Sequence, residues 1–262
     1  MIGEPEIIEH GDRDDGRAWP ALVWQFAEPV RTAATAVLGG GLGDRLWVIN
    51  AQVAKRYYRE PVDHLMTIAA GVRLDAAVGV GLLTAARVLD VAIAINNEAE
   101  CAATVGLSMP VWAAAPDDCR SDITVADGTH DYPAVPDDTT VDVVPQRRCD
   151  TRDRSHQYAV TADNAERGSR GWTPGTINLV CWVPAPLCDA ALVNAVVTAT
   201  EAKTQALLDA GMRATGTASD AVVVCTPRSG IEPYCGPRST WGARLARAVY
   251  AAVADGTARC LG

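Results

Sequence analysis

The sequence predicts an α+β fold in a single domain, with a mixed or mostly antiparallel sheet and helices packed on it. Strand-like apolar runs dominate the first half of the 262-residue chain, whereas the longest helical pattern lies in the second half. Hydrophobic residues make up 48% of the chain and charged residues 21%, which is typical of a globular protein with a substantial core. We therefore expect one core, formed by early strands and by helices that pack onto them later.

Short apolar runs in the first half predict strands, a helix and a hairpin. The expected strands are residues 21–27, 33–38, 46–50 and 77–83, and the expected hairpin pairs 91–95 with 101–107. Four glycines between Gly39 and Gly43 supply the positive φ that a tight connection needs. Pro61 suits the first turn of a helix over residues 61–70, which Gly71 would end.

The second half has a more regular pattern. A strand is expected at 177–183, followed by a long helix with Asp189 as its N-cap and Gly211 as its stop. Gly216 would lead into a buried strand over 217–225. A last helix is expected at 239–254, and Asp255-Gly256 would end it.

A polar segment at about 116–172 separates the two halves. It is rich in charged residues and proline and has no sustained periodicity. We expect it to be a surface insertion outside the core of one domain that spans residues 1–262.

Charge and cysteine usage exclude several classes of protein. A formal net charge of −9 and a pI near 4.9 argue against nucleic acid as a partner, since phosphate binding needs basic clusters. No apolar run is long enough for a membrane span, and the acidic N-terminus is unlike a secretory signal, so we expect a cytoplasmic protein. The eight cysteines lack zinc-site spacing; Cys101, Cys181 and Cys225 read as small core residues, and a disulfide between Cys119 and Cys149 is disfavoured.

Lys203 is the residue that most suggests chemistry. At 100° per residue it shares an arc of the long helix with Leu192, Val196 and Leu207, whereas Glu201 lies in a polar stripe that also includes Thr198. A lysine on a core-facing stripe is costly to desolvate unless it is paired. Lys203 therefore either extends its aliphatic chain past the helix edge so that the ammonium reaches water, or places a cation beside a reacting group.

Three turns rich in glycine and hydroxyl residues are candidates for an oxyanion site. They are residues 36–41, 174–178 and 214–220. Such turns let backbone N–H groups converge on an oxygen that gains negative charge, although an ordinary strand-edge turn explains each one equally well. Asp220 is either a general base, an orienting group or a turn cap.

Histidine and tryptophan give weaker signals. His64 reads as a core or surface histidine, and no Ser–His–Asp set is visible because the G-x-S-x-G elbow is missing. Trp47, Trp112, Trp182 and Trp241 either pack in the core or wall a large flat ligand.

Several long blocks carry a resemblance to a known family. They are TAATAVLGGGL at 32–42, ATVGLSMPVWA at 103–113, PGTINLV at 174–180, TATEAKTQAL at 198–207, ATGTASDAV at 214–222 and GPRSTWGARLARAV at 236–249. In these blocks the chain resembles the adenosylcobinamide amidohydrolases of corrinoid salvage. Ser219 stands where threonine is expected, which keeps a hydroxyl at that position.

The resemblance implies hydrolysis of the amide that joins the aminopropanol arm to the corrin ring, which yields adenosylcobyric acid. It implies a corrinoid substrate, with cobalt present only inside that substrate, and no protein-bound metal or other cofactor. The alternative is a corrinoid-binding or carrier protein that does not cleave its ligand. The oligomeric state is not readable from the sequence.

The candidate site residues follow from the motif positions. Lys203, Asp220, Glu201 and Thr217 are the catalytic candidates. Glu201 and Lys203 diverge by about 200° on the helix, which favours Lys203 with Asp220. Substrate contacts are expected from Gly40, Gly41, Thr176, Asn178, Gly216 and Ser219, with the turns and Lys203 converging on one cavity wide enough for a tetrapyrrole. Asn178 and the turns at Thr176 and Thr217 would donate to the oxyanion.

Overall fold

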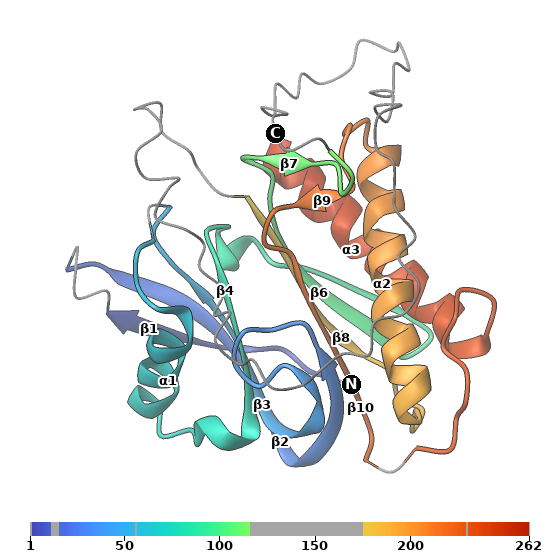
Figure 1. Cartoon of the computed structure of the whole chain (residues 1–262), viewed down its shortest axis with the longest axis horizontal. Helices are drawn as coiled ribbons and strands as arrows, with labels where there is room; N and C mark the ends of the chain where they lie inside the picture. The colour runs from blue at the N-terminus through green and yellow to red at the C-terminus, as the bar shows by residue number, and fades with distance from the viewer. Residues whose placement is uncertain (1, 12–15, 56, 116–174, 229, 262) are drawn as a thin grey trace, which may run out of the picture.

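The computed structural model describes residues 2–11, 16–55, 57–115, 175–228 and 230–261. Within these residues, one eight-stranded sheet carries three α-helices (Figure 1). The strands of this sheet are β1 (Glu6–Gly11), β2 (Ala18–Ala34), β3 (Gly41–Gln52), β4 (Gly79–Thr84), β5 (Ala92–Asn96), β6 (Ala99–Gly106), β8 (Thr176–Trp182) and β10 (Ala221–Thr226). The helices are α1 (Pro61–Gly71), α2 (Asp189–Asp209) and α3 (Thr240–Leu261), and β7 (Pro110–Val111) pairs with β9 (Gly216–Thr217) in a separate ribbon.

The sheet is mixed and mostly antiparallel, as the sequence predicts. Its order is β4-β3-β2-β10-β8-β6-β5, and β1 pairs with β2. Only β3–β4 and β8–β10 are parallel among the pairs of described strands. The α+β class is therefore confirmed.

The two strands expected at 21–27 and 33–38 are one long strand, β2. Its register with β3 shifts between Gln25 and Val30, a stretch that includes Pro29. Proline is tolerated at such an irregularity because it cannot donate to the ladder. The strand ends at Ala34 rather than Leu38. The prediction of two separate strands was therefore wrong, and so was the predicted end of the second.

The sheet folds on itself, so that its two halves face each other across a shared core. Leu22, Trp24 and Val48 of β2 and β3 belong to one cluster with Val180 of β8 and Val223 of β10. Side chains alternate between the two faces of a strand. The inner face of β8 therefore carries Val180, whereas its outer face carries residues that meet the helices.

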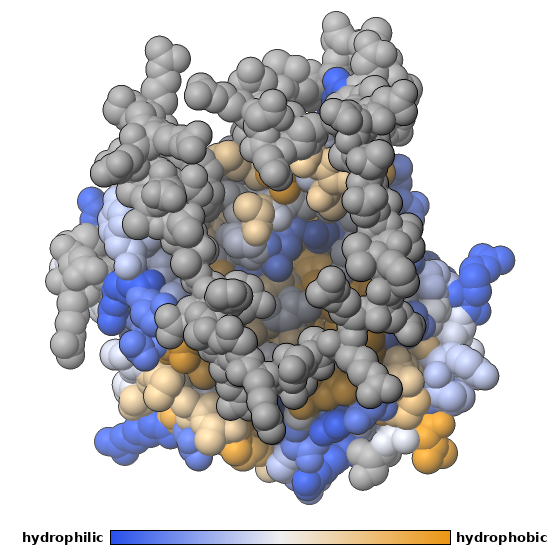
Figure 2. Space-filling view, in the orientation of Figure 1, coloured by the Kyte–Doolittle hydropathy of each residue, from blue (hydrophilic) through white to orange (hydrophobic). Residues whose placement is uncertain are grey.

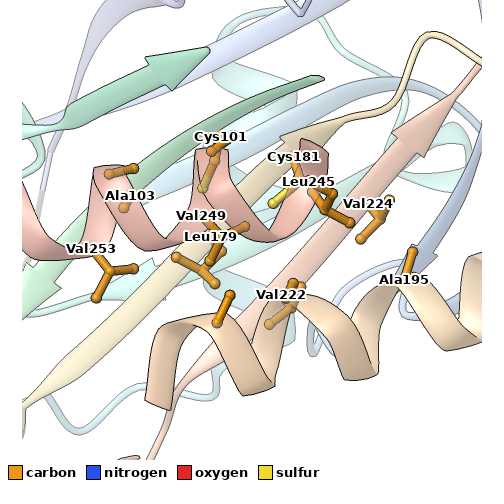
Figure 3. Packing of buried hydrophobic residues seen from close by; sticks show 14 of the residues in the cluster. Cys101, Ala103, Leu179, Cys181, Ala195, Val222, Val224, Leu245, Val249 and Val253 are labelled. Carbon is orange, nitrogen blue, oxygen red and sulfur yellow. The ribbon is translucent and has the colours of Figure 1, made fainter. Parts of the chain in front are cut away.

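Helices α2 and α3 cover the outer face of β6, β8 and β10 (Figure 3). Leu179, Val222 and Val224 of the strands pack against Ala195 of α2 and Val249 of α3. On the other half of the sheet, α1 packs on β3 and β4 through a cluster that includes Leu65, Ile68, Trp47 and Ile49.

Helix ends show where local signals hold and where packing overrides them. Gly211 follows α2 at φ +78, so it ends the helix as predicted. The N-cap of α2 is Cys188, not Asp189, and it makes no side-chain cap bond. Asp189 instead accepts two hydrogen bonds from Arg31 at 2.8 and 2.9 Å, which draws its carboxylate away from the helix N–H groups.

Helix α3 continues through Asp255-Gly256, where the sequence predicts a stop. A Cβ at Gly256 would lie 2.6 Å from Val105 Cγ2, so this glycine lets α3 approach the sheet closely. Asp255 pairs with Arg259 one turn later on the exposed side. The glycine is a packing residue rather than a helix end.

Several other predictions are confirmed, whereas the strand expected at 77–83 begins only at Gly79 and the strand expected over 217–225 is divided into β9 and β10. Helix α1 begins at Pro61, and β5 and β6 form the expected hairpin around Asn97 and Glu98, whose φ angles are 45° and 71°. Cys101, Cys181 and Cys225 are fully buried core residues. In the ranges described above, no helix is long and apolar enough to cross a membrane. The segment 116–172, with Cys119 and Cys149, lies outside the described residues.

Candidate active site

Lys203 lies on the buried side of α2, as its position in the helical pattern predicts. Its neighbours on this side include Ala199, Ala202 and Ala206, whose small side chains let the helix lie close to the sheet. The lysine is only 6% exposed, and its Nζ forms an ion pair with Asp220 at the start of β10. The ammonium is therefore paired inside the protein and does not reach out to bulk water.

The Asp220 carboxylate accepts hydrogen bonds from four donors. Oδ2 accepts from Lys203 Nζ and, at 3.1 Å, from the Thr217 N–H. Oδ1 accepts from the Ile177 N–H at 2.9 Å and from the Thr217 hydroxyl. These donors occupy the acceptor positions of a carboxylate. Asp220 thus holds together the first residues of β8, the β9 ribbon and α2.

Gly216 makes the ion pair sterically possible. A Cβ at this position would lie 2.3 Å from Asp220 Oδ2 and 2.5 Å from Lys203 Nζ. Any larger residue would have to displace one of the two charged groups. The glycine predicted to contact substrate therefore has an observed role in admitting the pair.

Hydroxyl groups line the edge beside this pair. Thr217 Oγ1 lies 2.9 Å from the Gly175 carbonyl oxygen, and Thr176 Oγ1 lies 2.8 Å from Ser219 Oγ. Ser219 Oγ also lies 3.2 Å from the same Gly175 oxygen. The turns at 175–178 and 214–220 therefore converge on one edge of the sheet, as predicted.

Asn178 faces the inner side of the folded sheet and has no free donor. Both protons of its Nδ2 are used, since it donates to Asn50 Oδ1 at 2.9 Å and to the Leu83 carbonyl at 3.0 Å. The Thr217 N–H is likewise occupied by Asp220. The prediction that these two groups donate to an oxyanion is therefore wrong, because both already have acceptors.

The β7–β9 ribbon fixes the position of Gly216 and Thr217. Thr215 donates through its N–H to the Val111 carbonyl at 2.9 Å, and its hydroxyl accepts from the Ala113 N–H at 2.8 Å. Thr204 of α2 donates to the Thr215 carbonyl at 3.1 Å. Gly175, Ile177 and Thr215 lie in the predicted turns, but the sequence indicates neither their hydrogen bonds nor the contribution of Thr204, because tertiary hydrogen bonds leave no periodic signal.

Three candidates are not brought to the pair. Glu201 is exposed on the far side of α2. Gly40 lies in the β2–β3 connection and Gly41 begins β3, and both are exposed. The connection begins beside β10, where the Thr35 N–H donates to the Val222 carbonyl at 3.0 Å. No contact between these glycines and Lys203 or Asp220 is seen within the described chain.

Thr198, expected on the exposed stripe with Glu201, is fully buried. Its hydroxyl donates to the Cys235 carbonyl at 2.8 Å, because the segment before α3 lies across this side of α2. Periodicity predicts which side of a helix meets the sheet, but not which other segments cover the remaining sides.

Other residue types do not complete a different catalytic set among the described residues. His64 is buried and its Nδ1 lies 3.0 Å from the Tyr57 hydroxyl, far along the chain from the ion pair. The described ranges contain no cluster of three His, Cys, Asp or Glu side chains that could hold a metal ion. A hydrogen bond with Cys181 and burial raise the pKa of the Cys101 thiol, and burial also raises the pKa of Cys225. These protonated thiols are poor nucleophiles.

Three of the candidate tryptophans, Trp47, Trp182 and Trp241, pack in different clusters of the described residues. Trp47 is buried against Gly79, and its indole N–H donates to the Asp75 carbonyl at 2.9 Å. Trp182 stacks on Phe26, while the guanidinium of Arg244 lies 4.5 Å from the centre of the Trp241 ring. Core and surface packing account for these positions.

A pocket of about 490 Å³ lies at the other end of β10 from the ion pair. It is lined by Arg31, Asp44, Asp189 and Arg228, whose charges pair with one another, and by the backbone near Leu187. Figure 2 shows a recess near the middle of one face, where hydrophilic residues lie above hydrophobic ones. The expectation of one cavity shared by all three turns is therefore met only in part, since two turns converge and the pocket lies elsewhere.

Comparisons with known proteins agree with the resemblance seen in the sequence. The family described as adenosylcobinamide amidohydrolase matches residues 5–262. An adenosylcobinamide amidohydrolase of Methanosarcina mazei is 38% identical over 92 residues, which are 31% of this chain and 46% of that relative. An adenosylcobinamide amidohydrolase of Halobacterium salinarum is 48% identical over 82 residues, 30% of this chain and 35% of that relative. The chain thus aligns with less than half the length of either relative. Because the family match covers nearly the whole sequence, the chain belongs to the adenosylcobinamide amidohydrolase family.

Proposed function

We propose that this protein hydrolyses the amide between the corrin ring and the aminopropanol arm of adenosylcobinamide, which yields adenosylcobyric acid for corrinoid salvage. The observation that carries the proposal is the buried Lys203–Asp220 pair, with the Thr217 hydroxyl bonded to the same carboxylate. Family membership supports the substrate. The cobalt enters and leaves inside the corrinoid, and no protein-bound metal takes part.

The four donors around Asp220 support a specific role for this residue in the proposed reaction. Three of the hydrogen atoms that face its carboxylate belong to the Lys203 ammonium and to the N–H groups of Ile177 and Thr217. The fourth belongs to the Thr217 hydroxyl, whose single proton is shared between Asp220 Oδ1 and the Gly175 carbonyl oxygen. If Asp220 acts as a general base, the proton it takes is that of Thr217, because no acceptor position is left for a water molecule. This makes the Thr217 oxygen the nucleophile.

Lys203 supplies positive charge where the reaction creates negative charge. The ammonium has three donors and gives one to Asp220. The remaining N–H groups bind the carbonyl oxygen of the substrate amide as it becomes an oxyanion. In a buried site such a preorganised charge stabilises the transition state strongly, since little water competes with it.

The bonds and protons balance over two stages. The Thr217 oxygen forms a bond to the amide carbon while its proton moves to Asp220. The C–N bond then breaks, and aminopropanol leaves with that proton as a neutral amine. Water hydrolyses the remaining Thr217 ester, which releases the carboxylic acid and restores the hydroxyl.

Product analysis tests the activity directly. Incubation of the protein with adenosylcobinamide should give adenosylcobyric acid, identified by the mass of the lost aminopropanol. Tight binding with an unchanged ligand would instead support the non-catalytic carrier and overturn the proposal.

Two variants of Thr217 test the nucleophile. Thr217→Val should lower kcat on the order of 10³-fold or more, because the attacking oxygen is removed. Thr217→Ser keeps a hydroxyl and should retain a large part of the activity. An acyl-enzyme trapped at residue 217 and detected by intact mass would support the route, whereas native turnover by Thr217→Val would overturn it.

A further inference from the structure

Asn178 is oriented by its neighbours. Its Nδ2 lies 3.0 Å from the carbonyl oxygen of Leu83, which can only accept a hydrogen bond. The amide nitrogen must therefore face Leu83, and the carbonyl oxygen Oδ1 must point the other way. The second proton of Nδ2 goes to Asn50 Oδ1 at 2.9 Å.

The Oδ1 atom of Asn178 is a buried acceptor without a donor among the residues that the structure describes. The side chain belongs to a residue that is only 1% exposed. A buried polar atom left unsatisfied costs about 1–3 kcal/mol. Such atoms are rare in native proteins, and each needs an explanation, which can be strain, a bound water or ion, or a functional contact.

Asn50 holds Asn178 in this orientation. Asn50 is also 1% exposed, and its Nδ2 donates to Thr104 Oγ1 at 3.0 Å. Because Thr104 binds the Nδ2 side of the Asn50 amide, the Oδ1 side faces Asn178 and accepts its hydrogen bond. The chain from Thr104 through Asn50 to Asn178 joins β6, β3 and β8, so it connects the two halves of the folded sheet.

This network lies close to the catalytic edge. Asn178 and Thr176 share the inner face of β8, two residues and roughly 6.6 Å apart along the strand. Thr176 bonds to Ser219 at the edge, and Asn178 is in register with Ala221, the residue after Asp220. The acceptor therefore lies just inside the edge where the scissile amide would bind.

We propose that Asn178 Oδ1 accepts a hydrogen bond from an amide N–H of the substrate, and that Asn50 is the positioning residue that presents it. This inference rests on the proposed function, because it names a contact of the same site. Two amide N–H sources share this chemistry: the scissile amide of the aminopropanol arm and the primary carboxamides on the corrin ring.

Binding measurements separate the two sources. Adenosylcobinamide binding is measured in a Thr217→Val background, which prevents turnover, and adenosylcobyric acid binding is measured in the same protein. Asn50→Leu should weaken binding about tenfold through loss of the oriented hydrogen bond. If only adenosylcobinamide binds more weakly, the donor is the scissile amide; if both ligands do, the donor is a ring carboxamide.

Two comparisons separate positioning from a general loss of structure. Thr104→Val should reproduce the Asn50→Leu effect, and Thr104→Ser should recover much of it, because serine keeps the acceptor for Asn50. Thr84→Val is the matched control: it removes another buried hydroxyl, which accepts from the Ala86 N–H at 3.0 Å and forms no hydrogen bond with Asn178 among the described residues. It should lower the unfolding free energy without a change in ligand affinity.

The outcomes distinguish the two proposals. Native affinity for both corrinoids in folded Asn50→Leu overturns the role of Asn50 and Asn178 and leaves the hydrolysis intact. If Asn50→Leu weakens corrinoid binding but the unsubstituted protein never releases aminopropanol, the hydrolysis is overturned and the Asn178 contact is supported. Absence of corrinoid binding by the unsubstituted protein overturns both.

Discussion

Replacement of Lys203 by methionine separates the structural part of the ion pair from its catalytic part. Methionine fills most of the space of the lysine stem and removes the charge. Loss of one partner of a buried pair costs about 3–5 kcal/mol because it leaves the other charge uncompensated. Here Asp220 keeps three of its four donors, from Ile177 and Thr217. We therefore expect a loss of about 2–3 kcal/mol of unfolding free energy, at or just below the lower end of that range.

The assay combines urea unfolding with hydrolysis of adenosylcobinamide by the folded fraction. Lys203→Met should lower kcat on the order of 10²–10³-fold, as expected when a preorganised charge is removed from an oxyanion. Asp220→Asn and the double variant complete a cycle that measures the coupling between the two residues. Unchanged unfolding free energy would contradict the buried pairing, and a folded Lys203→Met with the native rate would remove Lys203 from the mechanism.

Three other substitutions have definite expected outcomes. Glu201→Gln should leave kcat/KM within about twofold of the native value, because this exposed side chain lies away from the pair; a large loss would return Glu201 to the mechanism. Gly256→Ala should lower the unfolding free energy by about 1–3 kcal/mol in urea, since its Cβ would press on Val105, while Gly71→Ala, with open space around it, should not. Burial raises the pKa of Glu100, so the folded state favours its protonated form and the stability of the native protein falls as pH rises through that pKa. Glu100→Gln should therefore be more stable relative to the native protein at pH 8 than at pH 4. Equal shifts of the urea midpoint at both pH values would contradict this.

Local signals predicted those elements whose ends depend on backbone conformation. Gly211 ends α2 because a left-handed residue suits that position, and Asn97-Glu98 form the turn of the β5–β6 hairpin. The buried position of Lys203 followed from helical periodicity alone. These features depend on residues within one or two turns of each other.

Features that depend on distant segments were missed. The sequence alone predicts a helix end at Gly256, but the structure shows that this glycine allows close packing against Val105. The sequence likewise predicts an N-cap at Asp189, but its carboxylate binds Arg31. The free donor expected at Asn178 is taken by Asn50, which is 128 positions away in the chain. The site was predictable as a set of turns, but its hydrogen-bond assignments required the tertiary structure.

The Asp220 carboxylate draws its donors from three separate pieces of chain: the first residues of β8, the β9 ribbon and helix α2. No two of these pieces can build the reactive group without the third. Turnover should therefore behave as an all-or-none readout of assembly. On gradual denaturation the catalytic signal should disappear together with the docking of α2 onto the sheet, and a fragment that lacks this helix should be inert even where its strands still pair.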